Sequence, residues 1–199
     1  MAVFPIFLEL EGRRCLVIGE GEVAASRAVA LARAGAAVEQ RKDFAPAMLD
    51  GAALVFVAGA RRALADEVAR EAARRGIPVN VMDEPRLCSF LMPALVERGP
   101  VTIAIGTGGS APMLARLLRQ ALDAALPERL GPLAALAGRF RPLVMRRLAD
   151  PESRRGFWRR VFTGPVARLA LAGDDAAASA ALRSELDRAE RVGHRDAAA

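Results

Sequence analysis

The first half of the chain alternates short apolar runs with Ala-rich segments whose apolar residues recur at helical spacing. Short apolar runs bounded by glycine are typical of buried parallel strands. Their alternation with helices favours a parallel sheet that carries helices on its faces. The pattern predicts strands at 13–18, from 36 onward, at 54–58 and at 77–82, and helices at 23–33 and 64–75.

The pattern changes after residue 85. Residues 90–96 and 101–105 are expected to form two strands joined by a short turn, which indicates an antiparallel pair. A glycine-containing loop at 107–112 follows, and Pro112 suits the first position of a helix that runs to about residue 126.

Only helical segments are predicted beyond Pro127. Proline and glycine predict breaks in them at Pro132, Pro142, 150–151 and 164–165. The tail from Gly173 is Ala-rich and charged, and we expect it to fray.

Composition limits the chemistry that the chain can perform. Its 199 residues are 53% hydrophobic, which excludes a disordered chain. Its one histidine, His194, leaves no histidine-based triad or histidine-rich metal cage among the remaining residues. Cys15 and Cys88 make no disulfide framework, and Cys15 is expected to be a buried thiol. No segment is apolar enough to span a membrane, so a soluble, cytoplasmic protein is expected.

Arginine carries nearly all of the positive charge, since Lys42 is the single lysine and the net charge is +6. Between Pro112 and Leu171 there are twelve arginines and four acidic residues. One interpretation is a cationic wall facing a small polyanion. A solvated helical surface and a nucleic-acid-binding face are the alternatives, and the second lacks aromatic partners and any known motif.

A glycine-rich hexad, Gly19-Glu20-Gly21-Glu22-Val23-Ala24, fits the pattern G-x-G-x-x-A. It follows a predicted strand and opens a predicted helix, which is the context of a dinucleotide-binding loop. Gly19 would allow the tight turn and Gly21 would let the backbone approach a pyrophosphate. A strand-to-helix turn that binds nothing is the alternative.

The acidic residue that binds a ribose in such folds is expected about 20 positions further on, where Glu39 lies. The stretch between Val38 and Leu54 is too short for another helix and strand of a full nucleotide-binding unit. Either one unit is missing, or residues near Gln40–Arg41 are absent.

A carboxylate, Asp83, follows the predicted strand 77–82. Ligands of open α/β sheets bind at the carboxyl ends of the strands, so this side chain is a candidate general base or metal ligand. The alternative is an Asx-type turn before Pro85.

Several segments together resemble the N-terminal module of siroheme synthase: PIFLEL at 5–10, CLVIGEGEVAASRAVALARAGA at 15–36, NVMDEPRLCSFLMPALVERGPVTIAIGTGGSAPMLARLLR at 80–119 and RRGFWRRVF at 154–162. The resemblance implies an α/β fold, in which a Rossmann-like parallel sheet is followed by a dimerisation segment and a C-terminal helical domain. The corresponding ranges are 1–92, 93–126 and 127–190.

In that family the module is a precorrin-2 dehydrogenase, and in many members also a sirohydrochlorin ferrochelatase. The resemblance implies NAD as cofactor, tetrapyrrole substrates, Fe2+ as a substrate of chelation, a homodimer and no resident metal. It makes Asp83 the catalytic residue, as base in the oxidation and as proton acceptor or metal-handling group in chelation. It implies cofactor contacts at Gly19, Gly21, Glu22 and Val23, and substrate contacts at Asn80, Thr107, Gly108 and Gly109.

The chain also departs from the family pattern. Gly106-Thr107 stands where many members have a pair of hydroxyl residues, and Ala111 stands where serine is common. Residues are absent near Gln40, where ribose contacts lie, so NAD and NADP are not distinguished. The sequence ends at Ala199, before any counterpart of the methyltransferase half of fused siroheme synthases, so either a stand-alone enzyme or an excised module is expected. A module that senses a dinucleotide without catalysis is the alternative function.

Overall fold

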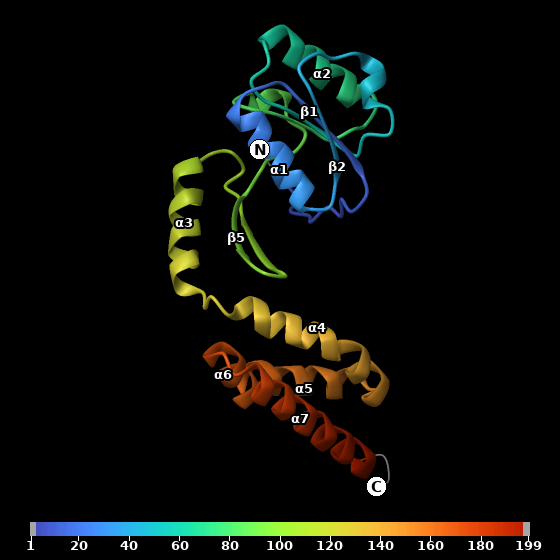
Figure 1. Cartoon of the computed structure of the whole chain (residues 1–199), viewed down its shortest axis with the longest axis vertical. Coiled ribbons are helices and arrows are strands. Elements are labelled where there is room, and N and C mark those ends of the chain that lie inside the picture. The colour runs from blue at the N-terminus through green and yellow to red at the C-terminus, as the bar shows by residue number, and fades with distance from the viewer. Residues whose placement is uncertain (1–2, 197–199) are drawn as a thin grey trace. The chain divides into compact units, whose positions relative to one another are not determined.

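The computed structural model describes residues 3–196 (Figure 1), and it describes side chains for residues 3–191. The chain divides into two compact units. The sheet unit contains the residues up to Pro93 together with Gly106–Pro112. The helical unit contains Ala94–Ile105 and the residues from Met113 onward. The division at 1–92, 93–126 and 127–190 stays a prediction.

The sheet unit contains four parallel strands in the order β2-β1-β3-β4, as the alternating pattern predicted. Its elements, in chain order, are β1 (Arg14–Ile18), α1 (Glu22–Arg33), β2 (Ala37–Arg41), the short 3-10 helix η1 (Pro46–Leu49), β3 (Leu54–Val57), α2 (Arg62–Arg74), β4 (Val79–Val81) and η2 (Pro85–Leu87). Helices α1 and α2 cover opposite faces of the sheet. Successive side chains of β1 point to opposite sides of the sheet, and they meet different helices. Leu16 packs in the cluster that contains α2, and Val17 in the cluster that contains α1.

The connection from β2 to β3 contains η1 and no α-helix. This agrees with the expectation that the segment after Val38 is too short for a further helix and strand. Buried Leu49 of η1 joins the same hydrophobic cluster as α2.

The strand predicted at 90–96 begins four residues later, because β5 spans Ala94–Arg98. Residues 89 and 90 are held by the sheet unit instead. Ser89 N–H donates to the Val79 carbonyl (2.8 Å), and the Phe90 ring packs edge-on against Phe56 (5.3 Å between centroids). The antiparallel partner β6 (Val101–Ile105) lies where the sequence predicted it.

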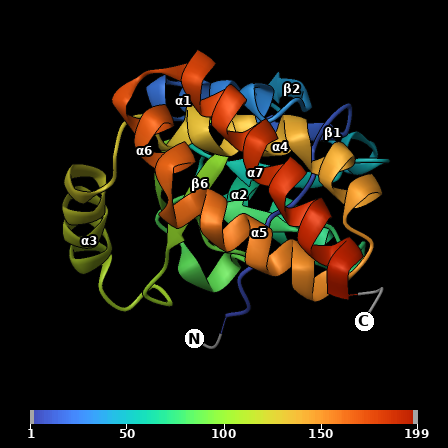
Figure 2. The same ribbon diagram turned by 90° about the horizontal axis from the view of Figure 1, so that it is seen from below.

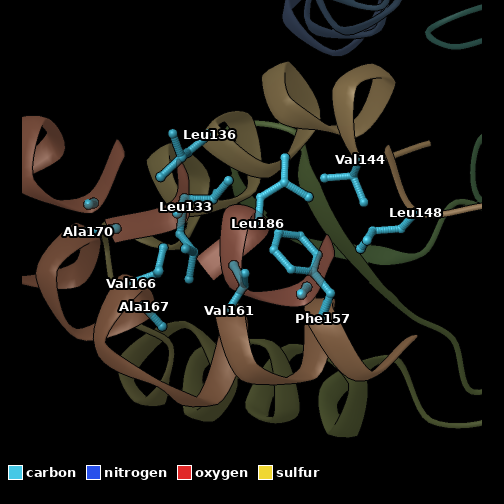
Figure 3. Close-up of a cluster of buried hydrophobic side chains, with 13 residues drawn as sticks. Leu133, Leu136, Val144, Leu148, Phe157, Val161, Val166, Ala167, Ala170 and Leu186 are labelled. Carbon is cyan, nitrogen blue, oxygen red and sulfur yellow. The ribbon is translucent and has the colours of Figure 1, made fainter. Parts of the chain in front are cut away.

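The helical unit combines this hairpin with five helices among the described residues: α3 (Pro112–Ala125, from Met113), α4 (Leu130–Arg147), α5 (Pro151–Thr163), α6 (Pro165–Ala172) and α7 (Asp175–Asp196). The last four share one core, in which Phe157 of α5 is fully buried among leucine and valine side chains (Figure 3). The hairpin turn packs on the start of α4, where a Cβ on Gly131 would lie 2.6 Å from the Arg98 carbonyl oxygen.

Two predictions about the helices are wrong. Helix α4 runs through Pro132 and Pro142, whereas breaks were predicted at both. Pro132 lies in the first turn, where an N–H has no partner within the helix. Around Pro142, burial of Leu136 and Val144 in the core holds the flanking turns together.

The tail after Gly173 was expected to fray, but its described part forms α7, which packs beside α4, α5 and α6 (Figure 2). Residues 197–199 of this tail lie outside the described residues. The buried residues of α7 recur at helical spacing, as Ala178, Leu182, Leu186 and Ala189. This apolar face anchors the helix to the core. The predicted breaks at 150–151 and 164–165 are confirmed.

Within the described residues, none of the helices is both long enough and apolar enough to cross a membrane.

Candidate dinucleotide and strand-end site

The strand order of the sheet reverses between β1 and β3, since β2 flanks β1 on one side and β3 flanks it on the other. In open α/β sheets, ligands bind outside the carboxyl ends of the strands at such a point. Two loops meet there, one after β1 and one after β3. A Cβ on Gly19 would overlap the Ala58 carbonyl, and a Cβ on Gly59 would overlap the Glu20 carbonyl. The two loops therefore contact each other backbone to backbone, which only glycine permits.

Gly21 occupies the N-cap position of α1 with a φ of 89°. No side chain caps this end of the helix, and a Cβ on Gly21 would meet nothing within 4 Å. The first helical residues, Glu22 and Val23, are exposed. An uncapped helix start with open space in front of it fits a pyrophosphate, which would accept hydrogen bonds from the free backbone amides. The residues present thus fit the diphosphate of a dinucleotide.

The carboxylate of Glu39, the candidate ribose acceptor, forms ion pairs with two arginines. Arg14 Nη2 lies 2.6 Å from its Oε2, and Arg41 Nη2 lies 2.6 Å from its Oε1. Hydrogen bonds from Arg14 and, to a smaller extent, from Arg41 lower the pKa of the Glu39 carboxyl. The end of β2 is tied to the glycine loop instead, because Gly19 N–H donates to the Arg41 carbonyl (2.7 Å).

Asp83 sits in a turn that closes β4. Glu84 N–H donates to the Val81 carbonyl (3.3 Å) across this turn. Asp83 has a φ of 60°, and it is the one non-glycine residue with positive φ in the described part of the chain. Aspartate tolerates this conformation better than most residues, and such outliers are concentrated at functional sites.

The Asp83 carboxylate is exposed and takes part in no hydrogen bond or ion pair within the described residues. The predicted alternative, an Asx-type turn in which this side chain accepts a backbone hydrogen bond, is therefore not formed. Asp83 instead lines a pocket of about 160 Å³ between the carboxyl ends of β3 and β4, together with Gly59, Arg62 and Glu84. An unpaired carboxylate beside open space can accept a proton from a bound molecule.

Asn80, a predicted substrate contact, lies on β4 and holds the following chain. Its side-chain amide donates to the Phe90 carbonyl (2.9 Å). Its role toward a substrate stays a prediction, with its carbonyl oxygen as the remaining polar group.

The loop that carries the other predicted substrate contacts folds with the sheet unit, as Asp83 does. Thr107 Oγ1 accepts a hydrogen bond from Ala111 N–H (3.3 Å), and the Thr107 carbonyl accepts one from Ser110 N–H (3.1 Å). Gly108 and Gly109 both have positive φ, 61° and 80°. The Thr107 hydroxyl thus stabilises the loop, and the contact of all three residues with substrate stays a prediction.

Three residues of this site were not predicted from the sequence: Gly59, Arg62 and Glu84. Gly59 directly follows the predicted strand 54–58, so its position after a buried strand was an available signal. Arg62 and Glu84 are 22 positions apart, and nothing in the local sequence indicates that they pair.

The arginine excess of the second half is partly neutralised within the helical unit. Acidic residues of α7, beyond the window in which the excess was counted, pair with Arg129, Arg147 and Arg160. The ring of Phe157 is fully buried in the core of this unit. Among the described residues, no three or more His, Cys, Asp or Glu side chains form a group that could hold a metal ion.

The sheet order, the glycine loop and the strand-end carboxylate define an α/β protein of the Rossmann type, joined to a helical unit. Three family models match it in succession. These are Putative NAD(P)-binding at residues 6–40 and 38–94, Sirohaem biosynthesis protein central at 98–125, and Sirohaem synthase dimerisation region at 129–186. The chain belongs to the siroheme synthase family.

Curated relatives are siroheme synthases. The protein of Nitrosospira multiformis is 42% identical over 212 residues, which cover 94% of this chain and 45% of the relative. That of Pseudomonas fluorescens is 40% identical over 208 residues, which cover 94% of this chain and 45% of the relative. The chain thus spans about half the length of the curated relatives it matches.

The first of these alignments is longer than the chain of 199 residues, so the relative contains residues that have no counterpart here. The NAD(P)-binding model matches in two segments that meet at residues 38–40. This is the place where the sequence indicated either a missing unit or absent residues.

The fold matches a solved structure named SirC, precorrin-2 dehydrogenase. The TM-score is 0.70 over 92% of this chain and all of that chain, at 20% identity. At this identity the likeness shows the fold, and it confirms a Rossmann-like sheet followed by a helical part.

Proposed function

We propose that the chain is an NAD-dependent dehydrogenase that oxidises precorrin-2 to sirohydrochlorin. The observation that carries the proposal is the unpaired Asp83 carboxylate, which lies in a left-handed turn within the same unit as the glycine loop. Membership of the siroheme synthase family supports the choice of substrate.

In this proposal Gly19 and Gly21 bring the backbone close to the diphosphate, and the amides of Glu22 and Val23 hold it. NAD, when bound, supplies the acceptor for a hydride from the substrate. The Asp83 carboxylate takes the accompanying proton, so that the substrate loses two hydrogens and two electrons. No histidine is required for either transfer.

Anaerobic incubation of the protein with precorrin-2 and NAD tests the proposal. We expect NADH absorbance to rise in proportion to sirohydrochlorin formed. Absence of NADH with NAD still bound would favour the alternative, a dinucleotide-sensing module. A parallel reaction with Fe2+ tests chelation: siroheme would extend the proposal to a ferrochelatase, and accumulating sirohydrochlorin would restrict it to oxidation.

A cytoplasmic location stays a prediction.

We further propose that the chain forms a homodimer. Four apolar side chains of α3, Met113, Leu114, Leu117 and Leu118, are between 43% and 63% exposed. A patch of this kind on one helix is costly in water and typical of protein interfaces. The match of residues 129–186 to a dimerisation region supports the same assembly.

Replacing Leu117 by Glu is expected to convert the dimer to a monomer, because the interface would bury an unpaired charge. The mass in solution, measured by light scattering after size-exclusion chromatography, should fall by half. Leu117→Met, which keeps this face apolar and of similar volume, should leave the dimer intact. A dimeric Leu117→Glu protein would exclude this face from the interface.

A further inference from the structure

Glu84, the residue after Asp83, is held through three of its polar groups. Its N–H donates to the Val81 carbonyl (3.3 Å), its own carbonyl accepts from Cys88 Sγ (3.4 Å), and its carboxylate pairs with Arg62. Asp83 makes no such contact within the described residues. The turn is therefore fixed by the neighbour of Asp83, and the Asp83 carboxylate is left free at the pocket.

Arg62 is itself fixed within α2. Its Nε donates to both carboxylate oxygens of Asp66, at 3.0 Å each, and Asp66 lies one helical turn further along. Its Nη1 pairs with Glu84. A planar guanidinium can hold two carboxylates in a defined geometry, which the single ammonium of lysine does less well. The ion pairs Asp66–Arg62–Glu84 thus connect α2 to the end of β4.

The pairing of Arg62 with Glu84 also affects the charge of the pocket. The charged residues that line it are Arg62, Asp83 and Glu84. In a space of about 160 Å³, two free carboxylates would repel each other and any anionic group of a ligand. Arg62 shares its single positive charge between Asp66 and Glu84, so it offsets part of the charge of Glu84. Because Glu84 is paired in this way, Asp83 is the one unpaired carboxylate among the residues that line this pocket.

We infer that Arg62 is a positioning residue, which orients Asp83 by holding Glu84 in place and offsetting part of its charge. The expected effect on catalysis rests on the proposed function, whereas the expected effect on the position of the turn does not. All three side chains are partly exposed, at 59%, 44% and 35% for Arg62, Asp66 and Glu84. Exposed ion pairs of this kind change an equilibrium by roughly two- to five-fold, and this sets the size of the expected effects.

The reaction rate of the Cys88 thiol measures how often the turn opens. This rate can be measured whether or not the protein is enzymatically active. Cys88 contacts Glu84 and Val81, and the chain's other cysteine, Cys15, is fully buried in β1. Arg62→Gln is expected to speed the reaction of Cys88 with a disulfide reagent about two- to five-fold, because the turn opens more often. Arg61→Gln, which removes the neighbouring charge outside the pocket, should leave the rate unchanged. Equal rates in Arg62→Gln and the wild-type protein would overturn the inference.

Kinetics then test the catalytic consequence. Arg62→Gln should lower kcat for precorrin-2 about two- to five-fold with the KM for NAD unchanged. Arg62→Lys should recover part of the loss. Arg62→Gln combined with Glu84→Gln should recover the part that is due to the uncompensated charge, and the part that is due to the lost ion pair should remain. A double variant no better than Arg62→Gln would overturn the neutralising role. A wild-type protein without activity would refute the proposed function, and the thiol rates would still decide whether Arg62 positions the turn.

Discussion

Asp83→Asn is expected to lower kcat for precorrin-2 oxidation by roughly 10²- to 10⁴-fold, the range that a general base contributes. Asparagine has nearly the same shape and tolerates a φ of 60°, so the turn should persist. Its amide cannot take a proton at neutral pH. NAD binding should be unchanged, because the glycine loop is separate from this turn. NADH formation under anaerobic conditions and calorimetric titration with NAD measure the two quantities.

Asp83→Gly provides the matched control for the backbone. Glycine adopts a left-handed conformation without strain, whereas alanine at this position would cost roughly 1 kcal/mol in addition to the lost carboxylate. Equal losses in the Asn and Gly variants would therefore assign the effect to the carboxylate. An Asn variant with the kcat of the wild-type protein would remove Asp83 from the reaction and refute the proposed mechanism.

The part of the site that is encoded locally was predictable from the sequence. Gly19 and Gly21 lie between an apolar strand and a helix, and Asp83 directly follows an apolar strand, so neighbouring residues indicate their place in the fold. Gly59, Arg62 and Glu84 were not predicted. Gly59 could have been found from its position directly after the predicted strand 54–58. The pairing of Arg62 with Glu84 depends on which loops come together at the strand ends, and the sequence pattern does not encode that contact.

The difference between local sequence signals and long-range packing also explains which predictions about the helical unit were wrong. Pro142 and the charged tail after Gly173 predict a break and fraying from local propensity alone. Burial of Val144 in α4, and of Leu182 and Leu186 in α7, outweighs that propensity because apolar burial contributes more per residue than helix propensity does. Where local propensity and burial agree, as in the apolar strand 54–58, the prediction from sequence was close: β3 spans Leu54–Val57.

Gly21→Val is expected to abolish binding of NAD while the sheet unit stays folded. A Cβ at this position would meet no protein atom within 4 Å, so the valine side chain would extend into the space in front of the start of α1. A diphosphate bound to the amides of this helix would occupy that space. Calorimetric titration with NAD, together with circular dichroism on the same samples, separates loss of binding from loss of fold.

The φ of 89° at Gly21 also makes valine strained, and the control must carry the same penalty. Gly76→Val does so, because Gly76 has a φ of 68°, also faces open space, and follows α2 at the opposite, amino-terminal edge of the sheet. Both variants should lose stability to a similar extent in thermal unfolding, and only Gly21→Val should lose NAD. If both bind NAD equally well, the loop after β1 does not hold the diphosphate, and the dinucleotide must bind elsewhere on the sheet unit.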